Sequence, residues 1–134
     1  MGSMLRGVSA LGDPLFFVLL ALGLVSWLLP EPDLAIPWTT LAALAVIEEI
    51  VFRGLLQDLF GRIFPGSFPV GLTPANLSTS LVFSLVHLLN HPPLWAISVF
   101  LPSLVFGWAK DRYGSLLPCI MLHFTYNLLF FHRP

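Results

Sequence analysis

Five long apolar runs alternate with short polar connections along the chain. The connections contain prolines, glycines and charged residues, which are typical of turns and helix ends. Thr73 followed by Pro74, and Ser115 at the head of the last run, are typical of helix starts. The pattern predicts an all-α protein. Its five helices are expected over residues 14–30, 37–60, 73–91, 94–110 and 115–131.

The composition places these helices in a membrane. Of the 134 residues, 57% are hydrophobic and 10% are charged, whereas a soluble domain has roughly 25% charged residues. We therefore predict a single integral membrane domain over residues 1–134, built as a compact bundle of about five transmembrane helices with the site inside. The net charge of −1 argues against a nucleic acid partner. Residues 1–3, before Met4, are interpreted as a remnant of cloning.

The second run carries charged side chains in its interior. Glu48, Glu49 and Arg53 lie within six residues, although one charge at bilayer depth costs about 2.5–3.5 kcal/mol. On a helix, Glu49 and Arg53 nearly share a face, so they can form an ion pair. Glu48 is turned about 100° away from Glu49 and has no such partner. The spacing predicts one neutralised carboxylate and one that is available for catalysis.

Two further runs carry isolated polar side chains. His87 lies four residues after Phe83 in the third run, and Asn127 lies four residues after His123 in the fifth. Polar side chains in a membrane face the interior of a helix bundle, so we expect them to converge with Glu48. A carboxylate can take a proton from water, and imidazole and amide donors can stabilise an oxyanion. The set predicts a hydrolytic site.

The three polar groups together resemble the motifs of a known family, the CPBP family. Its members are CAAX prenyl endopeptidases and bacteriocin-processing or immunity-related relatives, which are intramembrane glutamic proteases. The chain has fewer spans than the prenyl-processing members, so it is most similar to small bacterial ones, which implies a bacterial cytoplasmic membrane. The resemblance covers about residues 37–130 and is carried by Glu48-Glu49-x3-Arg53, Phe83-x3-His87 and His123-x3-Asn127, in this order on successive apolar runs.

The resemblance implies a role for each matching residue. Glu48 would be the general base on water, and His87 would help to hold and activate that water. His123 and Asn127 would stabilise the oxyanion. No cofactor or metal is implied, and the substrate would be a membrane-anchored or lipidated protein or peptide. The structural or supporting residues would be Glu49, Arg53 and Phe83.

Other readings of the same residues stay open. His91 lies four residues after His87, a spacing at which two histidines can bind zinc, and Glu48 and His123 could complete such a site in a zinc-dependent intramembrane peptidase. Leu88, however, stands where the zincin motif has its catalytic glutamate. A third reading is a non-catalytic membrane protein, such as an immunity factor or a carrier. Five helices are few to enclose a site, so a homo-oligomer is also an alternative.

Charged residues in the connections predict the orientation. If all five helices cross, Glu31 and Asp33 lie on one side with Arg133, and the other basic residues of the connections lie on the opposite side. Basic residues favour the cytoplasmic side, so we expect the N-terminus inside and the C-terminus outside. The site is then expected to open toward the outer leaflet. The basic residues on the inner side are Arg6, Arg62, Lys110 and Arg112.

Overall fold

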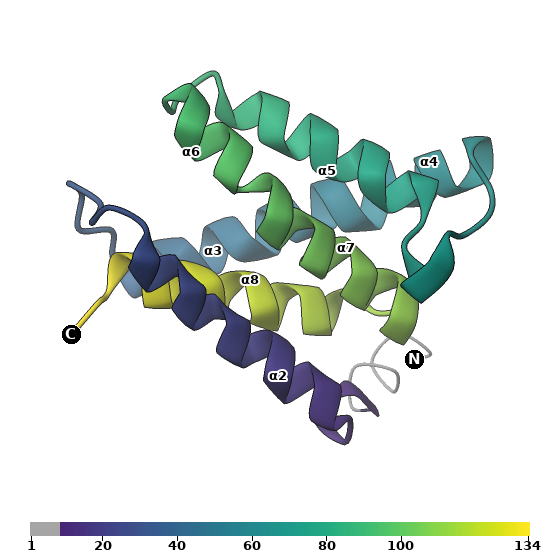
Figure 1. Cartoon of the computed structure of the whole chain (residues 1–134), viewed down its shortest axis with the longest axis horizontal. Helices are drawn as coiled ribbons and strands as arrows, with labels where there is room; N and C mark the ends of the chain where they lie inside the picture. The colour runs from purple at the N-terminus through teal and green to yellow at the C-terminus, as the bar shows by residue number, and fades with distance from the viewer. Residues whose placement is uncertain (1–8) are drawn as a thin grey trace.

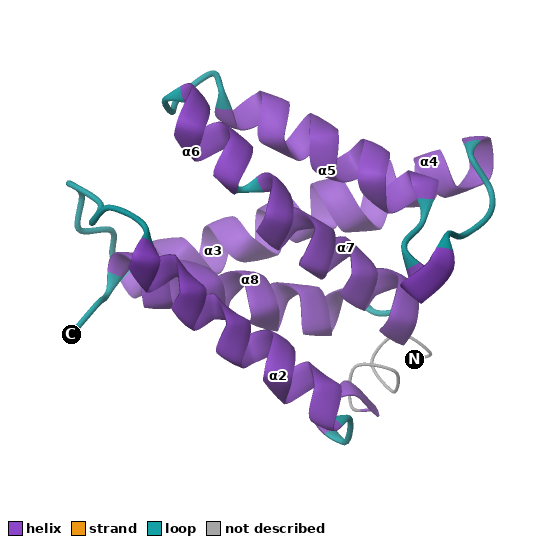
Figure 2. Ribbon diagram, viewed as in Figure 1, coloured by secondary structure: helices purple, strands orange, loops and turns teal. Residues whose placement is uncertain are grey.

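The computed structural model describes residues 9–134, and every regular element in this part of the chain is helical (Figure 2). The all-α prediction is confirmed for the described residues, whereas the proposed cloning remnant and Arg6 lie outside them. The elements are α2 (Pro14–Leu22), η1 (Gly23–Leu28), α3 (Trp38–Glu49), η2 (Ile50–Leu56), α4 (Gln57–Ile63), η3 (Pro69–Gly71), α5 (Pro74–His87), α6 (Pro93–Ser98), α7 (Phe100–Tyr113) and α8 (Leu116–Phe131).

The longer helices begin where the sequence supplies side-chain caps. The Asp13 carboxylate accepts a hydrogen bond from the backbone N–H of Leu15 at the start of α2 (3.0 Å). The Thr73 hydroxyl accepts one from the N–H of Asn76 at the start of α5 (3.0 Å), and Ser115 caps α8 in the same way. Within residues 9–134, each of the five predicted segments is helical, but the third ends at His87, and the fourth is divided at Val99 into α6 and α7 and runs on to Tyr113.

The second segment is a continuous helix whose central part is a π-helix. It runs from α3 through the π-helix η2 into α4. In an α-helix of about 3.6 residues per turn, residues eight apart are rotated by about 80°. The wider turns of a π-helix reduce that rotation. Glu49, Arg53 and Gln57 are accordingly all buried, with exposed fractions of 0%, 0% and 2%. The π segment keeps three polar side chains directed toward the bundle interior.

The helices are arranged around α7 and α8 (Figure 1). α7 packs against α5 and against α8, and α8 in turn packs against α3 and η1. At one end of the bundle Lys110 forms an ion pair with Asp58 of α4 (2.7 Å). The C-terminus lies at the other end, where the His132 side chain contacts the carbonyl of Ile36 (2.8 Å).

The bundle interior has an apolar half and a polar half. Between α2, α7 and α8, side chains such as Phe16, Phe106 and Leu122 form a buried apolar cluster. Between η2, α4, α5 and α7 the buried side chains are mostly polar. These polar side chains are Arg53, Gln57, Asn76, Thr79, Ser80 and Ser103.

Membrane-crossing capacity is clear for one helix of the described chain. The stretch Pro93–Tyr113 is long and apolar enough to cross a bilayer, while Pro14–Leu28 and Leu116–Phe131 are apolar but shorter. The stretch from α3 to α4 is long, but its interior carries the charges described above. Large apolar side chains such as Phe17, Ile47 and Leu101 lie exposed on the outer faces of the bundle, which suits contact with lipid. That all five segments cross stays a prediction.

At Gly107, α7 packs tightly against side chains of α4 and α5. Replacement of Gly107 by Ala should therefore destabilise the fold. A Cβ atom there would overlap the Asn76 side chain and lie 2.9 Å from Oε1 of Gln57. We expect a loss of about 1–3 kcal/mol, the usual cost of overpacking, seen as a lower thermal midpoint in detergent. The control is Gly61→Ala, whose Cβ would meet nothing closer than Ala75, at 3.9 Å. Equal midpoints for the two variants would contradict this packing argument.

Asp13 joins the start of α2 to the end of α7 in a pH-dependent way. The N–H of Leu15 first of all, and then the side chains of Arg112 and Tyr113, lower the pKa of Asp13 below its ordinary value of 3.8. A lowered pKa gives stability that is complete at neutral pH and is lost as the pH falls through the folded-state pKa. The thermal midpoint of the wild type should therefore be higher than that of Asp13→Asn at neutral pH. The difference between the two midpoints should disappear in acid. Asp33→Asn, which changes an exposed carboxylate, is the control; a gap that is constant with pH would refute the assignment.

Candidate active site

A cavity of about 200 Å³ lies at the end of the bundle where the chain terminates. Its walls come from η1, α3, α5, α6, α7 and α8, with the loop around Ile36 beside it. The structure brings the four residues that the sequence predicts for catalysis to this cavity. These residues are Glu48, His87, His123 and Asn127.

The two adjacent glutamates lie in different surroundings. Glu49 has an exposed fraction of 0%, and its Oε2 lies 3.4 Å from Nε of Arg53, which is equally buried. The ion pair that the spacing predicts is therefore present. The side chain of Glu48 is 27% exposed and borders the cavity. Helical phase thus turns one carboxylate into the protein and the other toward the space where a substrate can bind.

His123 connects the two carboxylates across the bundle. Its Nδ1 lies 2.7 Å from Oε1 of Glu49, and its Nε2 lies 3.7 Å from Oε2 of Glu48. An ionised carboxylate only accepts hydrogen bonds, so Nδ1 carries the proton and donates to Glu49. The ring of Phe106 stacks on the imidazole, with centroids 4.8 Å apart and planes 15° apart. These contacts fix the plane of the ring and direct Nε2 toward Glu48.

His87 is the last residue of α5 and borders the same cavity. Its Nδ1 donates to the backbone carbonyl of Phe83 (2.8 Å), because a carbonyl oxygen only accepts. In a neutral His87 the other ring nitrogen, Nε2, is then an acceptor. The rings of Phe83 and His87 lie 4.5 Å apart, as their spacing of four residues suggests. Phe83 therefore supports His87 through both its carbonyl and its ring.

Asn127 lies one helical turn after His123 on α8 and borders the same cavity. Within residues 9–134 its side-chain amide makes no hydrogen bond, so it can bind a group that enters the cavity. The roles of Glu48, His87, His123 and Asn127 in a reaction stay predictions, since geometry alone assigns no chemistry to them.

His91 packs against other rings that line the cavity. Its ring stacks on that of His87, with centroids 5.8 Å apart, and on Trp95, with centroids 5.1 Å apart. In the described part of the chain, no three His, Cys, Asp or Glu side chains are grouped so that they could hold a metal ion.

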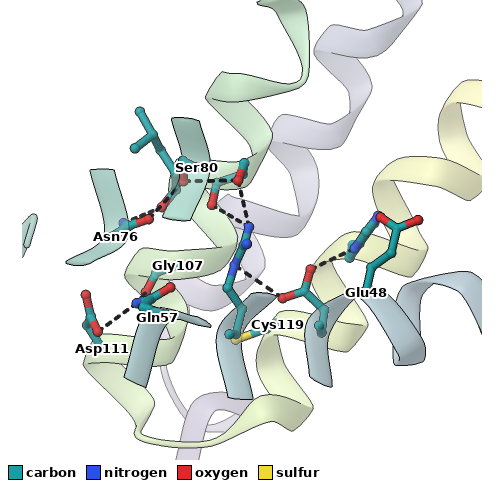
Figure 3. Close-up of polar contacts among 12 residues, drawn as sticks. Glu48, Gln57, Asn76, Ser80, Gly107, Asp111 and Cys119 are labelled. Carbon is teal, nitrogen blue, oxygen red and sulfur yellow. Dashed lines mark hydrogen bonds and ion pairs between the residues drawn. The ribbon is translucent and has the colours of Figure 1, made fainter. Parts of the chain in front are cut away.

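A buried polar network behind the cavity holds Arg53 (Figure 3). Nη2 of Arg53 donates to the backbone carbonyl of Ser103 (2.9 Å) and to its hydroxyl (2.8 Å). That hydroxyl donates to Ser80, which donates to Oδ1 of Asn76. Sequence reasoning missed these residues. Asn76 and Ser80 carried a signal, since they lie four residues apart on one helix face, whereas Ser103 in α7 carried none.

A comparison with known protein families agrees with the three motifs. Residues 13–129 match the family described as type II CAAX prenyl endopeptidase Rce1-like, so the match covers most of the chain and all candidate residues. Comparisons with curated proteins and with solved structures found no match. The matching family is a membrane-embedded protease family. The resemblance that the sequence indicates is thereby confirmed, and the chain belongs to the Rce1-like family of type II CAAX prenyl endopeptidases.

Proposed function

We propose that the protein is an intramembrane endopeptidase that hydrolyses a peptide bond in a membrane-anchored or lipidated protein or peptide, with Glu48 as its general base. One observation carries the proposal. A carboxylate that borders the cavity lies 3.7 Å from an imidazole, and a second, buried carboxylate holds that imidazole in place. Membership of a protease family supports peptide hydrolysis, and this geometry supports a carboxylate as the base.

A water molecule is the nucleophile in the proposed reaction. Glu48 takes a proton from the water as its oxygen attacks the carbonyl carbon of the scissile bond. Glu48 then gives this proton to the leaving nitrogen as the carbon–nitrogen bond breaks. His87 can orient the same water, because Nε2 of the neutral ring accepts a hydrogen bond while Nδ1 donates to Phe83.

The oxyanion formed in this attack needs hydrogen-bond donors, which we assign to His123 and Asn127. Since Nδ1 of His123 already donates to Glu49, a second donor at Nε2 requires the imidazolium form. In that form two cations, Arg53 and His123, balance the two carboxylates. Such a balance matters because unpaired charges are costly in an interior with little water. Preorganised donors of this kind contribute strongly to catalysis.

The walls of the cavity favour an apolar peptide segment. Leu41, Val99, Phe106 and Phe130 are among its lining residues, and none of the described residues that line it is Lys or Arg. Its volume of about 200 Å³ is below the ~300–1,000 Å³ of typical small-molecule sites. It therefore suits the scissile bond and the neighbouring side chains, while the rest of a membrane-anchored substrate stays outside.

Replacing Glu48 by Gln should remove the base and preserve the shape of the side chain. We expect kcat to fall by at least about 100-fold, as is usual for loss of general-base catalysis. The measurement is cleavage of a library of lipid-anchored fluorogenic peptides by the protein in vesicles.

The matched control for this variant is Glu31→Gln, which changes an exposed glutamate in the loop between η1 and α3. Each protein is assayed with and without a chelator. Full activity of Glu48→Gln would exclude the carboxylate mechanism, and loss of wild-type activity with chelator would favour the zinc-dependent alternative.

We also propose that the cavity end faces the outside of a bacterial cytoplasmic membrane, with the N-terminus inside and the C-terminus outside. A membrane-impermeant maleimide on intact cells should then label Glu31→Cys but not Arg62→Cys. The native Cys119 is buried, so its background is expected to be low. Labelling of the position 62 cysteine alone would reverse the orientation. Permeabilised cells, in which both cysteines should react, provide the control.

A further inference from the structure

Arg53 is held from two sides, and only one of them belongs to the site described above. Toward the cavity, its Nε lies 3.4 Å from Glu49. Away from the cavity, its Nη2 donates both to the carbonyl and to the hydroxyl of Ser103 (Figure 3). Because the guanidinium group is planar and rigid, two hydrogen bonds at Nη2 also fix the direction of Nε, whereas a single bond there would let the group pivot. The contact with Ser103 thus acts on the carboxylate that orients His123.

The hydrogen bonds in this network have a defined direction. Nδ2 of Asn76 donates to the carbonyl of Leu104 (2.9 Å), which leaves Oδ1 of the same amide as an acceptor. The Ser80 hydroxyl donates to that Oδ1 (3.1 Å), and the Ser103 hydroxyl donates to Ser80 (3.0 Å). Each hydroxyl uses its proton on the side away from Arg53. Ser103 is therefore left with its lone pairs toward the guanidinium group, as a charged donor requires.

We propose that Ser103 is a positioning residue for catalysis: its hydroxyl sets the orientation of Arg53, and through Glu49 it sets the direction of Nε2 of His123. This inference rests on the proposed function, because the orientation of His123 matters for the oxyanion step. Ser103 itself is 0% exposed and is not among the residues that line the cavity, so it cannot touch the substrate.

The geometry indicates that the Ser103 hydroxyl matters more for the orientation of Arg53 than for the stability of the fold. A buried ion pair is weak evidence for stability, since desolvation offsets much of the attraction between the charges. Loss of the Ser103 hydroxyl leaves the carbonyl of Ser103 as an acceptor for Nη2. The guanidinium group then stays in the protein but can pivot. The expected consequence is a misdirected Glu49–His123 pair in a folded molecule.

The test is a series of serine variants assayed in vesicles with lipid-anchored fluorogenic peptides. Ser103→Ala should lower kcat by roughly tenfold with little change in KM, since a lost hydrogen bond to a charged group and a small misplacement both slow the reaction. Ser80→Ala, one bond further from Arg53, should lower kcat by about threefold. Ser103→Thr, which retains a hydroxyl, should keep more activity than Ser103→Ala.

The matched control is Ser84→Ala. Ser84 is also a buried serine, and its hydroxyl donates to the carbonyl of Ala96 rather than to the network of Arg53. It should keep wild-type kcat. Equal losses in Ser84→Ala and Ser103→Ala would overturn the proposal, and so would a Ser103→Ala variant that melts lower but turns over at the wild-type rate.

A second measurement is independent of peptidase activity. In the ¹⁵N-histidine-labelled protein in micelles, the proton on Nδ1 of His123 should give a low-field NMR signal that is absent from His123→Gln. We expect this signal to be lost or to move upfield in Ser103→Ala and to be unchanged in Ser84→Ala. An unchanged signal in Ser103→Ala would overturn the positioning role. If Glu48→Gln is fully active while the signal changes, the proposed function fails and the structural coupling stands.

Discussion

The ion pair between Glu49 and Arg53 is the constraint on which the rest of this structure depends. Both side chains are fully buried, and a buried charge has to be matched by polar groups from its surroundings. α8 supplies His123 to Glu49, and α7 supplies Ser103 to Arg53. The pair therefore ties two helices to the second segment of the chain. The buried apolar cluster between α2, α7 and α8 contains no charged side chain.

The adjacent carboxylates show how one helix can place one side chain at a cavity and the next one in the protein interior. A step of about 100° per residue separates Glu48 from Glu49, so one borders the cavity and the other is enclosed. The π segment η2 begins directly after Glu49 and keeps Arg53 and Gln57 turned inward. Segments of this kind are frequent at functional sites. Here the π segment allows the buried polar side to extend along the helix without rotating onto the outer surface of the bundle.

Helix α7 is the element that receives these polar side chains. Its backbone carbonyls at Ser103, Leu104 and Gly107 accept hydrogen bonds from Arg53, Asn76 and Gln57, respectively. The absence of a side chain at Gly107 lets α4 and α5 approach closely enough for these bonds. Three residues after Ser103, Phe106 stacks on His123. One helix thus supports the site both through its backbone and through an aromatic ring.

The sequence by itself determined the helices and the identity of the candidate residues. Apolar runs and caps such as Thr73 act locally, and a charge in an apolar helix is conspicuous because it is costly. The sequence also predicted the pairing of Glu49 with Arg53, since four residues on one helix are neighbours. Only the tertiary structure decided that Glu49 contacts His123, 74 residues away. It also decided that Ser103 contacts Arg53 and that Phe106 stacks on His123. Contacts between helices depend on their rotation and packing, and a serine or a phenylalanine in an apolar helix has no local feature that reveals them.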